Sequence, residues 1–264
     1  MNRPPANSRS EFAEALRKGL LLGAAFLVVS LPPVLTVRSP APQSVPPLAA
    51  GVPPSPAATP PAQLAVARHA DFRRERASQD ARRMANWIVQ SGDHQRRSFV
   101  IVDKKDARVY VFDPAGRLQS AAPALLGQSH GDDTVPGIGN KPVAEVLPQE
   151  RTTPAGRFVA ELGASSSRGE DVVWVDYDAA VSMHRVLKKP ERLKALASPT
   201  KDDNRMSYGC INLPPPFYEK VLRPAVQRTG AIIYVLPETR PLHEVFASFQ
   251  DVNGPVRLAQ RAAP

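Results

Sequence analysis

The 264-residue chain contains a single cysteine, Cys210. A lone cysteine has no partner for an intrachain disulfide, and an oxidising compartment tolerates an unpaired thiol mainly when it is buried or useful. We therefore expect the Cys210 thiol to remain free. A free thiol has a pKa of about 8.5 and is mostly protonated near neutrality, so a reactive Cys210 would need a base beside it.

The sequence also lacks the signatures of several binding classes. It has no RNP-like aromatic pattern, no zinc-ligand spacing and no internal repeat. The formal net charge of +9 would suit an anionic partner such as nucleic acid, a phospholipid surface or an anionic wall polymer. Without a recognition motif we expect no nucleic-acid partner, and a generally basic, solvated surface is the simplest explanation of the charge. A metal site built from His130, His184 and Cys210 has no ligand spacing to support it, so we expect no metal.

Charge is absent from residues 19–37, which follow a polar segment with basic side chains at Arg3, Arg9, Arg17 and Lys18. This pattern predicts either a cleaved signal peptide or an uncleaved signal-anchor with its basic end in the cytoplasm. We favour the anchor for residues 1–37 because no small-residue cleavage site follows closely. Both alternatives export the rest of the chain, so we expect a periplasmic or otherwise extracytoplasmic protein, anchored in the inner membrane.

Proline is abundant, with 29 residues in the chain, and it is concentrated just after this segment. Residues 38–62 are too poor in large apolar side chains to form a core and predict a Pro-rich, disordered linker. Residues 63–97 predict a helical lead-in: a helix over 63–90 that ends at Ser91, Gly92 and Asp93.

The pattern then changes to short apolar runs separated by turns, which is typical of β-strands. The expected strands are Ser98–Asp103, Arg108–Phe112, one within 117–126, 157–162, 171–175, 179–184 and 231–236. Short helices are expected at 190–197, after Pro214 and at 242–249. We therefore predict a mainly β fold, a β-meander or β-sandwich with a few short helices, over residues 98–237. Residues 238–264 would form a C-terminal helix and tail.

Residues 127–150 are rich in Gly, Asp and Pro and predict a long loop. His130 lies within it, in Ser129-His130-Gly131, and we interpret it as a loop residue. The alternative is that this loop folds over the functional site, as functional loops do.

Candidate chemistry is concentrated in residues 206–212, Met-Ser-Tyr-Gly-Cys-Ile-Asn. Gly209 would let the backbone turn sharply before Cys210, and backbone N–H groups from Tyr208 to Cys210 could face a developing oxyanion. His184 at the end of a predicted strand is the candidate base. The alternatives are a buried structural Cys210, a hydrogen-bonded core histidine and a packing tyrosine.

The order of these motifs is informative. Thr153-Pro154-Ala155-Gly156, a strand-like run, His184 and then Ser207-Tyr208-Gly209-Cys210-Ile211-Asn212 resembles the catalytic region of the L,D-transpeptidases, the YkuD-like family. The resemblance covers about residues 98–237. Two features depart from it: Tyr208 stands where the family usually has a histidine, and the interval between His184 and Ser207 is longer than usual.

The resemblance implies that Cys210 attacks a peptidoglycan stem peptide, with His184 as the base and Ser207 ordering the site. Attack would release D-alanine, and an amine on a second stem, or on an envelope protein, would then resolve the thioester. Water as the acceptor would make the enzyme an L,D-carboxypeptidase, and a catalytically weak wall-binding module is the remaining alternative. No cofactor is implied. Candidates for substrate binding are Arg185, Arg205 and Asn212, although a solvated cation is the simpler interpretation of each arginine.

Overall fold

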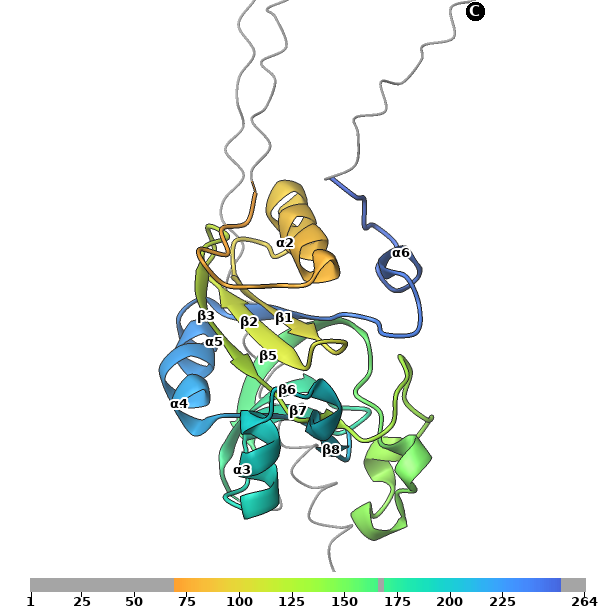
Figure 1. The fold of residues 1–264 in the computed structure, drawn as a ribbon. Helices are drawn as coiled ribbons and strands as arrows, with labels where there is room; N and C mark the ends of the chain where they lie inside the picture. The colour runs from red at the N-terminus through yellow and green to blue at the C-terminus, as the bar shows by residue number, and fades with distance from the viewer. Residues whose placement is uncertain (1–68, 166–168, 253–264) are drawn as a thin grey trace, which may run out of the picture. The chain divides into compact units, whose positions relative to one another are not determined.

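The computed structural model describes residues 69–165 and 169–252 (Figure 1). The predicted signal-anchor, the Pro-rich linker, the first residues of the lead-in and the last twelve residues of the C-terminal tail lie outside the described residues. Within the described ranges, no helix is long and apolar enough to cross a lipid bilayer.

One mixed sheet of eight strands dominates the described part of the chain, in the order β3-β2-β1-β10-β5-β6-β7-β9. Two further strands, β4 and β8, form a small separate sheet. The strand bounds are β1 Ser98–Asp103, β2 Arg108–Phe112, β3 Leu118–Pro123, β4 Leu126–Gly127, β5 Gly156–Ala164, β6 Asp171–Asp176, β7 Val181–Arg185, β8 Arg205–Ser207, β9 Ile211–Leu213 and β10 Ala231–Val235. The predicted mainly β class is confirmed for these residues.

The pairing of the strands explains two features of the sequence, the succession of short strands and the continuous apolar runs of β1 and β10. Strands β1, β2 and β3 are consecutive and antiparallel, which is the predicted meander. Strand β1 also pairs in parallel with β10, and every residue of both strands is buried. Strands buried on both faces read as continuous apolar runs, as these two do. A second parallel pair, β7 with β9, joins the segment of His184 to the segment of Cys210.

Helices cover both faces of the sheet. On one face, Val100, Val102 and Ile233 pack against the helical segment formed by α4 Pro215–Phe217, η5 Tyr218–Leu222 and α5 Arg223–Thr229. On the other face, Phe99, Ile101, Tyr110 and Tyr234 pack against α2 Gln79–Ser91 and α6 Leu242–Val245. Figure 1 shows α2 and α6 on the same side of β1 and β2.

The predicted helix over 63–90 is wrong for residues 69–78, because helix α2 begins at Gln79. Ser78 is its N-cap and accepts a hydrogen bond from the Ala81 N–H at 3.0 Å. Before it, Phe72 packs edge-on against Phe112, and the Asp71 backbone bonds to the turn after β2. Those tertiary contacts outweigh the helix propensity of the Arg- and Ala-rich segment. The predicted end is confirmed: Gly92, at φ 70°, is the C-cap.

The remaining helices differ from the predictions in detail. Helix α3 Pro190–Ala197 has the predicted bounds, whereas α6 ends at Val245, short of the predicted residue 249. The long loop contains three short 3₁₀ helices: η1 Ile138–Asn140, η2 Val143–Glu145 and η3 Pro148–Glu150. A fourth, η4 Lys201–Asn204, precedes β8.

Candidate active site

Cys210 lies in the tight turn between β8 and β9, immediately before β9 begins. Gly209 adopts φ +124°, and a Cβ at this position would lie 2.9 Å from the Thr152 carbonyl oxygen. Only glycine fits a backbone in this conformation with so close a neighbour. The Cys210 thiol is half-buried and free. The glycine before the cysteine therefore has the turn-forming role predicted from the sequence.

The parallel pairing of β7 with β9 assembles the site. Met183 is opposite Ile211 and His184 is opposite Asn212. Because side chains alternate between the two faces of a strand, Met183 and Ile211 enter the core. His184 and Asn212 lie on the other face. Cys210, in the turn before β9, reaches the same face, because its Sγ contacts Ser182, two residues before His184 on β7. The structure thus brings the predicted nucleophile and the predicted base to one face of adjacent strands.

Ser182 of β7 and Ala180, in the turn just before β7, contact the thiol. The Cys210 Sγ lies 3.8 Å from the Ser182 Oγ, and it donates to the Ala180 carbonyl oxygen at 3.7 Å. Ala180 has φ 53°, in the left-handed region that non-glycine residues rarely occupy. Such backbone strain is often found at functional sites. Ser182 was not predicted as a site residue, although its position two residues before His184 on a strand was a sequence signal.

A chain of hydrogen bonds orients the histidine. The His184 Nδ1 is 2.8 Å from the Arg185 carbonyl oxygen, which can only accept, so Nδ1 carries the proton of the neutral ring. The Nε2 atom is then the acceptor, and it faces the Asn212 Nδ2 at 3.4 Å. Arg192 donates to the Asn212 Oδ1 at 2.8 Å, which fixes the orientation of the amide.

Arg192 was missed from the sequence. It lies on α3, within the longer interval between His184 and Ser207 that departs from the resembled family. No sequence pattern links a basic residue on this helix to the site, because the contact depends on how α3 packs. Asn212, predicted as a candidate for substrate binding, contacts His184 and accepts from Arg192.

Ser207 holds the turn on both sides of the cysteine. Its hydroxyl donates to the Cys210 carbonyl oxygen at 2.6 Å and accepts from the Gly209 N–H at 3.1 Å. These contacts fit the ordering role that the resemblance implies. They also engage the Gly209 N–H within the turn.

Tyr208 lies at the rim of the site, with 44% of its surface exposed. The Arg151 guanidinium stacks on its ring, 3.9 Å from the ring centroid, and donates to the Gln128 side chain and to the Val146 carbonyl. Gln128 lies at the start of the long loop, and Arg151 directly follows its end. Both ends of the loop are therefore linked to the rim of the site by the contact between Arg151 and Tyr208.

Thr153 connects the Thr-Pro-Ala-Gly turn to the cysteine turn. Its hydroxyl donates to the Gly209 carbonyl oxygen at 2.8 Å and accepts from the Gly127 N–H at 2.9 Å. Its own carbonyl oxygen accepts from the Lys104 ammonium at 3.0 Å. One residue thus links β4, the residue before Cys210 and a buried lysine.

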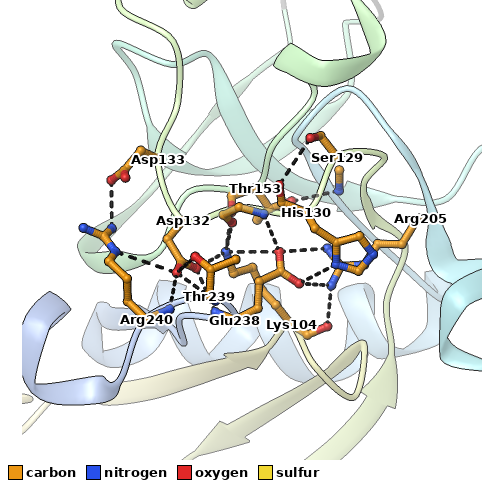
Figure 2. A network of polar contacts seen from close by, with 12 residues as sticks. Lys104, Ser129, His130, Asp132, Asp133, Thr153, Arg205, Glu238, Thr239 and Arg240 are labelled. Atoms are coloured by element: carbon orange, nitrogen blue, oxygen red, sulfur yellow. Dashed lines mark hydrogen bonds and ion pairs between the residues drawn. The ribbon is translucent and has the colours of Figure 1, made fainter.

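Figure 2 shows the polar network around that lysine. Lys104 is fully buried, and its ammonium donates to Gly131, to the Asp132 carboxylate at 2.9 Å and to Thr153. Asp132 also accepts from the Glu238 N–H at 2.7 Å and from Thr239. The network therefore joins segments that are far apart in the sequence, and it holds the start of the long loop against the end of the sheet.

The network shifts the ionisation of its members. Burial alone would raise the pKa of the Asp132 carboxyl, but hydrogen bonds from Thr239 and Lys104 hold it well below its ordinary value. For Glu238, burial is likewise outweighed by the Gly131 N–H and the charges of Arg205 and Lys104, so its pKa is lowered. Burial lowers the pKa of Lys104 despite these carboxylates.

Three residues singled out in the sequence contact carboxylates. Arg185 pairs with Asp171 at 2.8 Å and with Glu219, and Arg205 pairs with Glu238. His130 is exposed, and its Nδ1 lies 3.0 Å from Glu238. These contacts favour structural roles for both arginines, and they place His130 in the Lys104 network. Within residues 69–165 and 169–252, no group of three or more His, Cys, Asp or Glu side chains is arranged to hold a metal.

Comparison with known proteins gives structural matches alone. No family model matches the chain, and no curated protein matches it. Among solved structures, the catalytic domain of an Enterococcus faecium L,D-transpeptidase is 16% identical, with coverage of 53% of this chain and 98% of that chain and a TM-score of 0.33. The helical cell shape determining protein Pgp2 of Campylobacter jejuni is 16% identical, with coverage of 55% and 49% and a TM-score of 0.36.

A third structure, L,D-transpeptidase 1 of Mycobacterium tuberculosis, is 21% identical, with coverage of 53% of this chain and 60% of that chain and a TM-score of 0.28. The match spans half of a longer Enterococcus faecium L,D-transpeptidase chain, 50% of its length. At these values the likeness decides neither fold nor function. The function of the chain is therefore inferred from the geometry of its own residues and from the order of its motifs.

Proposed function

We propose that the chain is a cysteine acyl-transferase of the bacterial envelope that acts on peptidoglycan stem peptides as an L,D-transpeptidase. One observation carries the proposal: the parallel pairing of β7 with β9 gathers Ser182, His184, Cys210 and Asn212 on one face. The motif order read from the sequence supports the substrate class.

In the first half-reaction the Cys210 sulfur attacks the carbonyl carbon of the third stem residue. His184 accepts the thiol proton at Nε2, and its Nδ1–H bond to the Arg185 carbonyl stabilises the imidazolium that forms. The bond to the terminal D-alanine breaks, and His184 gives the proton to the leaving amine. A thioester to Cys210 remains.

The negative charge that develops on the attacked carbonyl oxygen needs donors that are already in place. Ser207 engages the Gly209 N–H in the turn. We therefore assign oxyanion binding to the other backbone N–H groups of residues 208–210, which Ser207 and Thr153 hold in position.

In the second half-reaction an amine from another stem, or from an envelope protein, attacks the thioester carbonyl. His184 takes the proton of the amine and returns it to the departing thiolate of Cys210. Water in place of the amine would give the L,D-carboxypeptidase reaction. Both half-reactions use Cys210 as the nucleophile and His184 as the acid and base, and neither requires a cofactor.

The domain boundaries and location are also proposals. We propose that residues 98–237 form the catalytic domain, carried outside the cytoplasm by the signal-anchor of residues 1–37 and the linker of 38–62. The charge-free segment 19–37 and the Pro-rich composition that follows it support this arrangement.

Product analysis tests the proposed function. The protein would be incubated with a purified disaccharide-tetrapeptide, and products would be separated and identified by mass. We expect a cross-linked dimer that has lost one D-alanine and is absent with Cys210→Ala. Release of disaccharide-tripeptide without dimer would assign the carboxypeptidase reaction instead, and unchanged tetrapeptide would contradict both.

A further inference from the structure

The sheet face that carries Cys210 continues beyond the site as an aromatic surface. Trp174 of β6 is the direct cross-strand partner of Ser182 in β7, so both side chains lie on the same face. On the other side of Trp174, its partner in β5 is Glu161. Glu161, Trp174 and Ser182 thus form a row across β5, β6 and β7. The row leads from an exposed carboxylate to Cys210, in the turn before β9, whose Sγ contacts Ser182.

Tyr177 completes this surface. Its ring stacks on the indole of Trp174, with centroids 4.7 Å apart and planes inclined by 24°. Tyr177 is 58% exposed, although large aromatic side chains are usually covered. We name the surface formed by Glu161, Trp174 and Tyr177 the aromatic ledge.

The backbone is adapted to this arrangement. A Cβ at Gly163 would lie 2.6 Å from the Trp174 Nε1 and 3.6 Å from the Tyr177 hydroxyl, so the indole occupies the space above Gly163. Next to the ledge, Val159 is 46% exposed, and its cross-strand partner Ile232 is buried beneath α2 and α6. Apolar side chains on this face thus continue from the helix-covered half to the ledge, which Ser182 separates from Cys210.

The chemistry of the ledge suits one class of ligand. A pyranose ring presents flat C–H surfaces that stack on aromatic rings, and its hydroxyl groups donate to carboxylates. The ledge offers both kinds of group, two stacked rings and the acceptor-only carboxylate of Glu161. A free carboxylate of a peptide would be repelled by Glu161.

The distance fits the proposed substrate. Trp174 is two strands away from Cys210, which at about 4.8 Å per strand is about 10 Å. Three residues of extended peptide span about 10 Å at 3.3–3.6 Å per residue. A stem whose third residue reaches Cys210 can therefore place the sugar that carries it on the ledge.

We propose that the aromatic ledge is a glycan subsite, which binds the N-acetylated amino sugar at the base of the stem peptide. The inference rests on the proposed function for the identity of the substrate. The ledge then selects stems that are still attached to glycan over free peptides.

The first measurement tests binding of a sugar to the ledge and does not depend on turnover. The chain has two tryptophans, and Trp87 is buried, so a sugar-dependent change in tryptophan emission reports Trp174. Titration with the trimer of N-acetylglucosamine should give a saturable change. Tyr177→Ala should weaken that binding by about tenfold, the factor given by about 1.4 kcal/mol of stacking and burial.

Leu162→Ala is the matched control, because Leu162 is exposed on the opposite face of β5. It should bind the trimer as the wild type does. No saturable change, or equal affinities for Tyr177→Ala and Leu162→Ala, would overturn the subsite. A saturable change with free tetrapeptide in place of the sugar, lost in Tyr177→Ala, would assign the ledge to peptide and would also overturn it.

Turnover gives the second measurement. The ratio of kcat/KM for disaccharide-tetrapeptide to that for free tetrapeptide should exceed one in the wild type and fall about tenfold in Tyr177→Ala. Sugar binding without any acyl transfer would reject the proposed function and leave the ledge intact. Acyl transfer with the same ratio in both proteins would reject the ledge and leave the proposed function intact.

Discussion

At the scale of single residues, Tyr208 marks where the chain departs from the family that it resembles. The ring, and not the hydroxyl, makes the contact with Arg151. Tyr208→Phe keeps that stack, so we expect kcat/KM for acylation to fall by at most the worth of one neutral hydrogen bond, about 1 kcal/mol. Steady-state kinetics on the tetrapeptide checks this. Loss of all activity in Tyr208→Phe would require a proton-transfer role for the hydroxyl.

In the proposed mechanism, Arg192 is a positioning residue, because it contacts His184 through Asn212. Arg192→Leu should slow acylation by about tenfold or more, because a small misplacement of a catalytic group is costly. Arg192→Lys should recover part of the rate, since lysine can still donate to the Asn212 Oδ1. Single-turnover acylation measures both.

Lys194→Leu is the control for this prediction, because Lys194 is an exposed cation on the same helix. It should acylate at the wild-type rate. Equal rates for Arg192→Leu and Lys194→Leu would show that Asn212 keeps its orientation without the guanidinium.

At the scale of elements, Thr153 ties the cysteine turn to β4. Thr153→Val is nearly isosteric and leaves the Gly209 carbonyl and the Gly127 N–H without the hydroxyl. The free energy of unfolding should fall by about 1–3 kcal/mol, the cost of buried polar groups left unpaired. Thr153→Ser keeps both bonds and should lose less. Urea unfolding measures the free energy of unfolding of both variants. Equal losses of stability in Thr153→Val and Thr153→Ser would contradict the role of the hydroxyl.

Most strands could be predicted from the sequence because each is a short apolar run between turns. The helix before β1 was predicted too long, since Phe72 and Asp71 make tertiary contacts that composition does not reveal. Cys210 and His184 were found as a motif. Arg192, Lys104 and the aromatic ledge were not, because each depends on segments that meet only in the folded chain.

At the scale of the whole molecule, the buried charges of Figure 2 join Lys104, just after β1, to Glu238, just after β10. The pKa values of Asp132 and Glu238 lie below their ordinary values of 3.8 and 4.5 in the folded state. Depressed carboxyl pKa values contribute stability that is present above the ordinary values and lost as the pH falls through the folded ones. Stability should therefore decline as the pH falls below about 4.5.

Asp132→Asn tests this coupling, because it leaves the Lys104 ammonium buried without that carboxylate. The free energy of unfolding at pH 7 should fall by about 3–5 kcal/mol. Its acid dependence should also become shallower than in the wild type. Urea unfolding between pH 2 and pH 7 measures both quantities, and an unchanged acid dependence would remove Asp132 from the explanation.

The proposed mechanism requires that Cys210 forms a thioester with the stem peptide and that His184 activates the thiol. Intact-protein mass spectrometry after rapid mixing with disaccharide-tetrapeptide detects such an intermediate. We predict an added mass equal to the substrate minus D-alanine, located on the Cys210 peptide, absent in Cys210→Ala and formed orders of magnitude more slowly in His184→Ala. An adduct that persists in Cys210→Ala, or one that forms at the wild-type rate in His184→Ala, would contradict the mechanism.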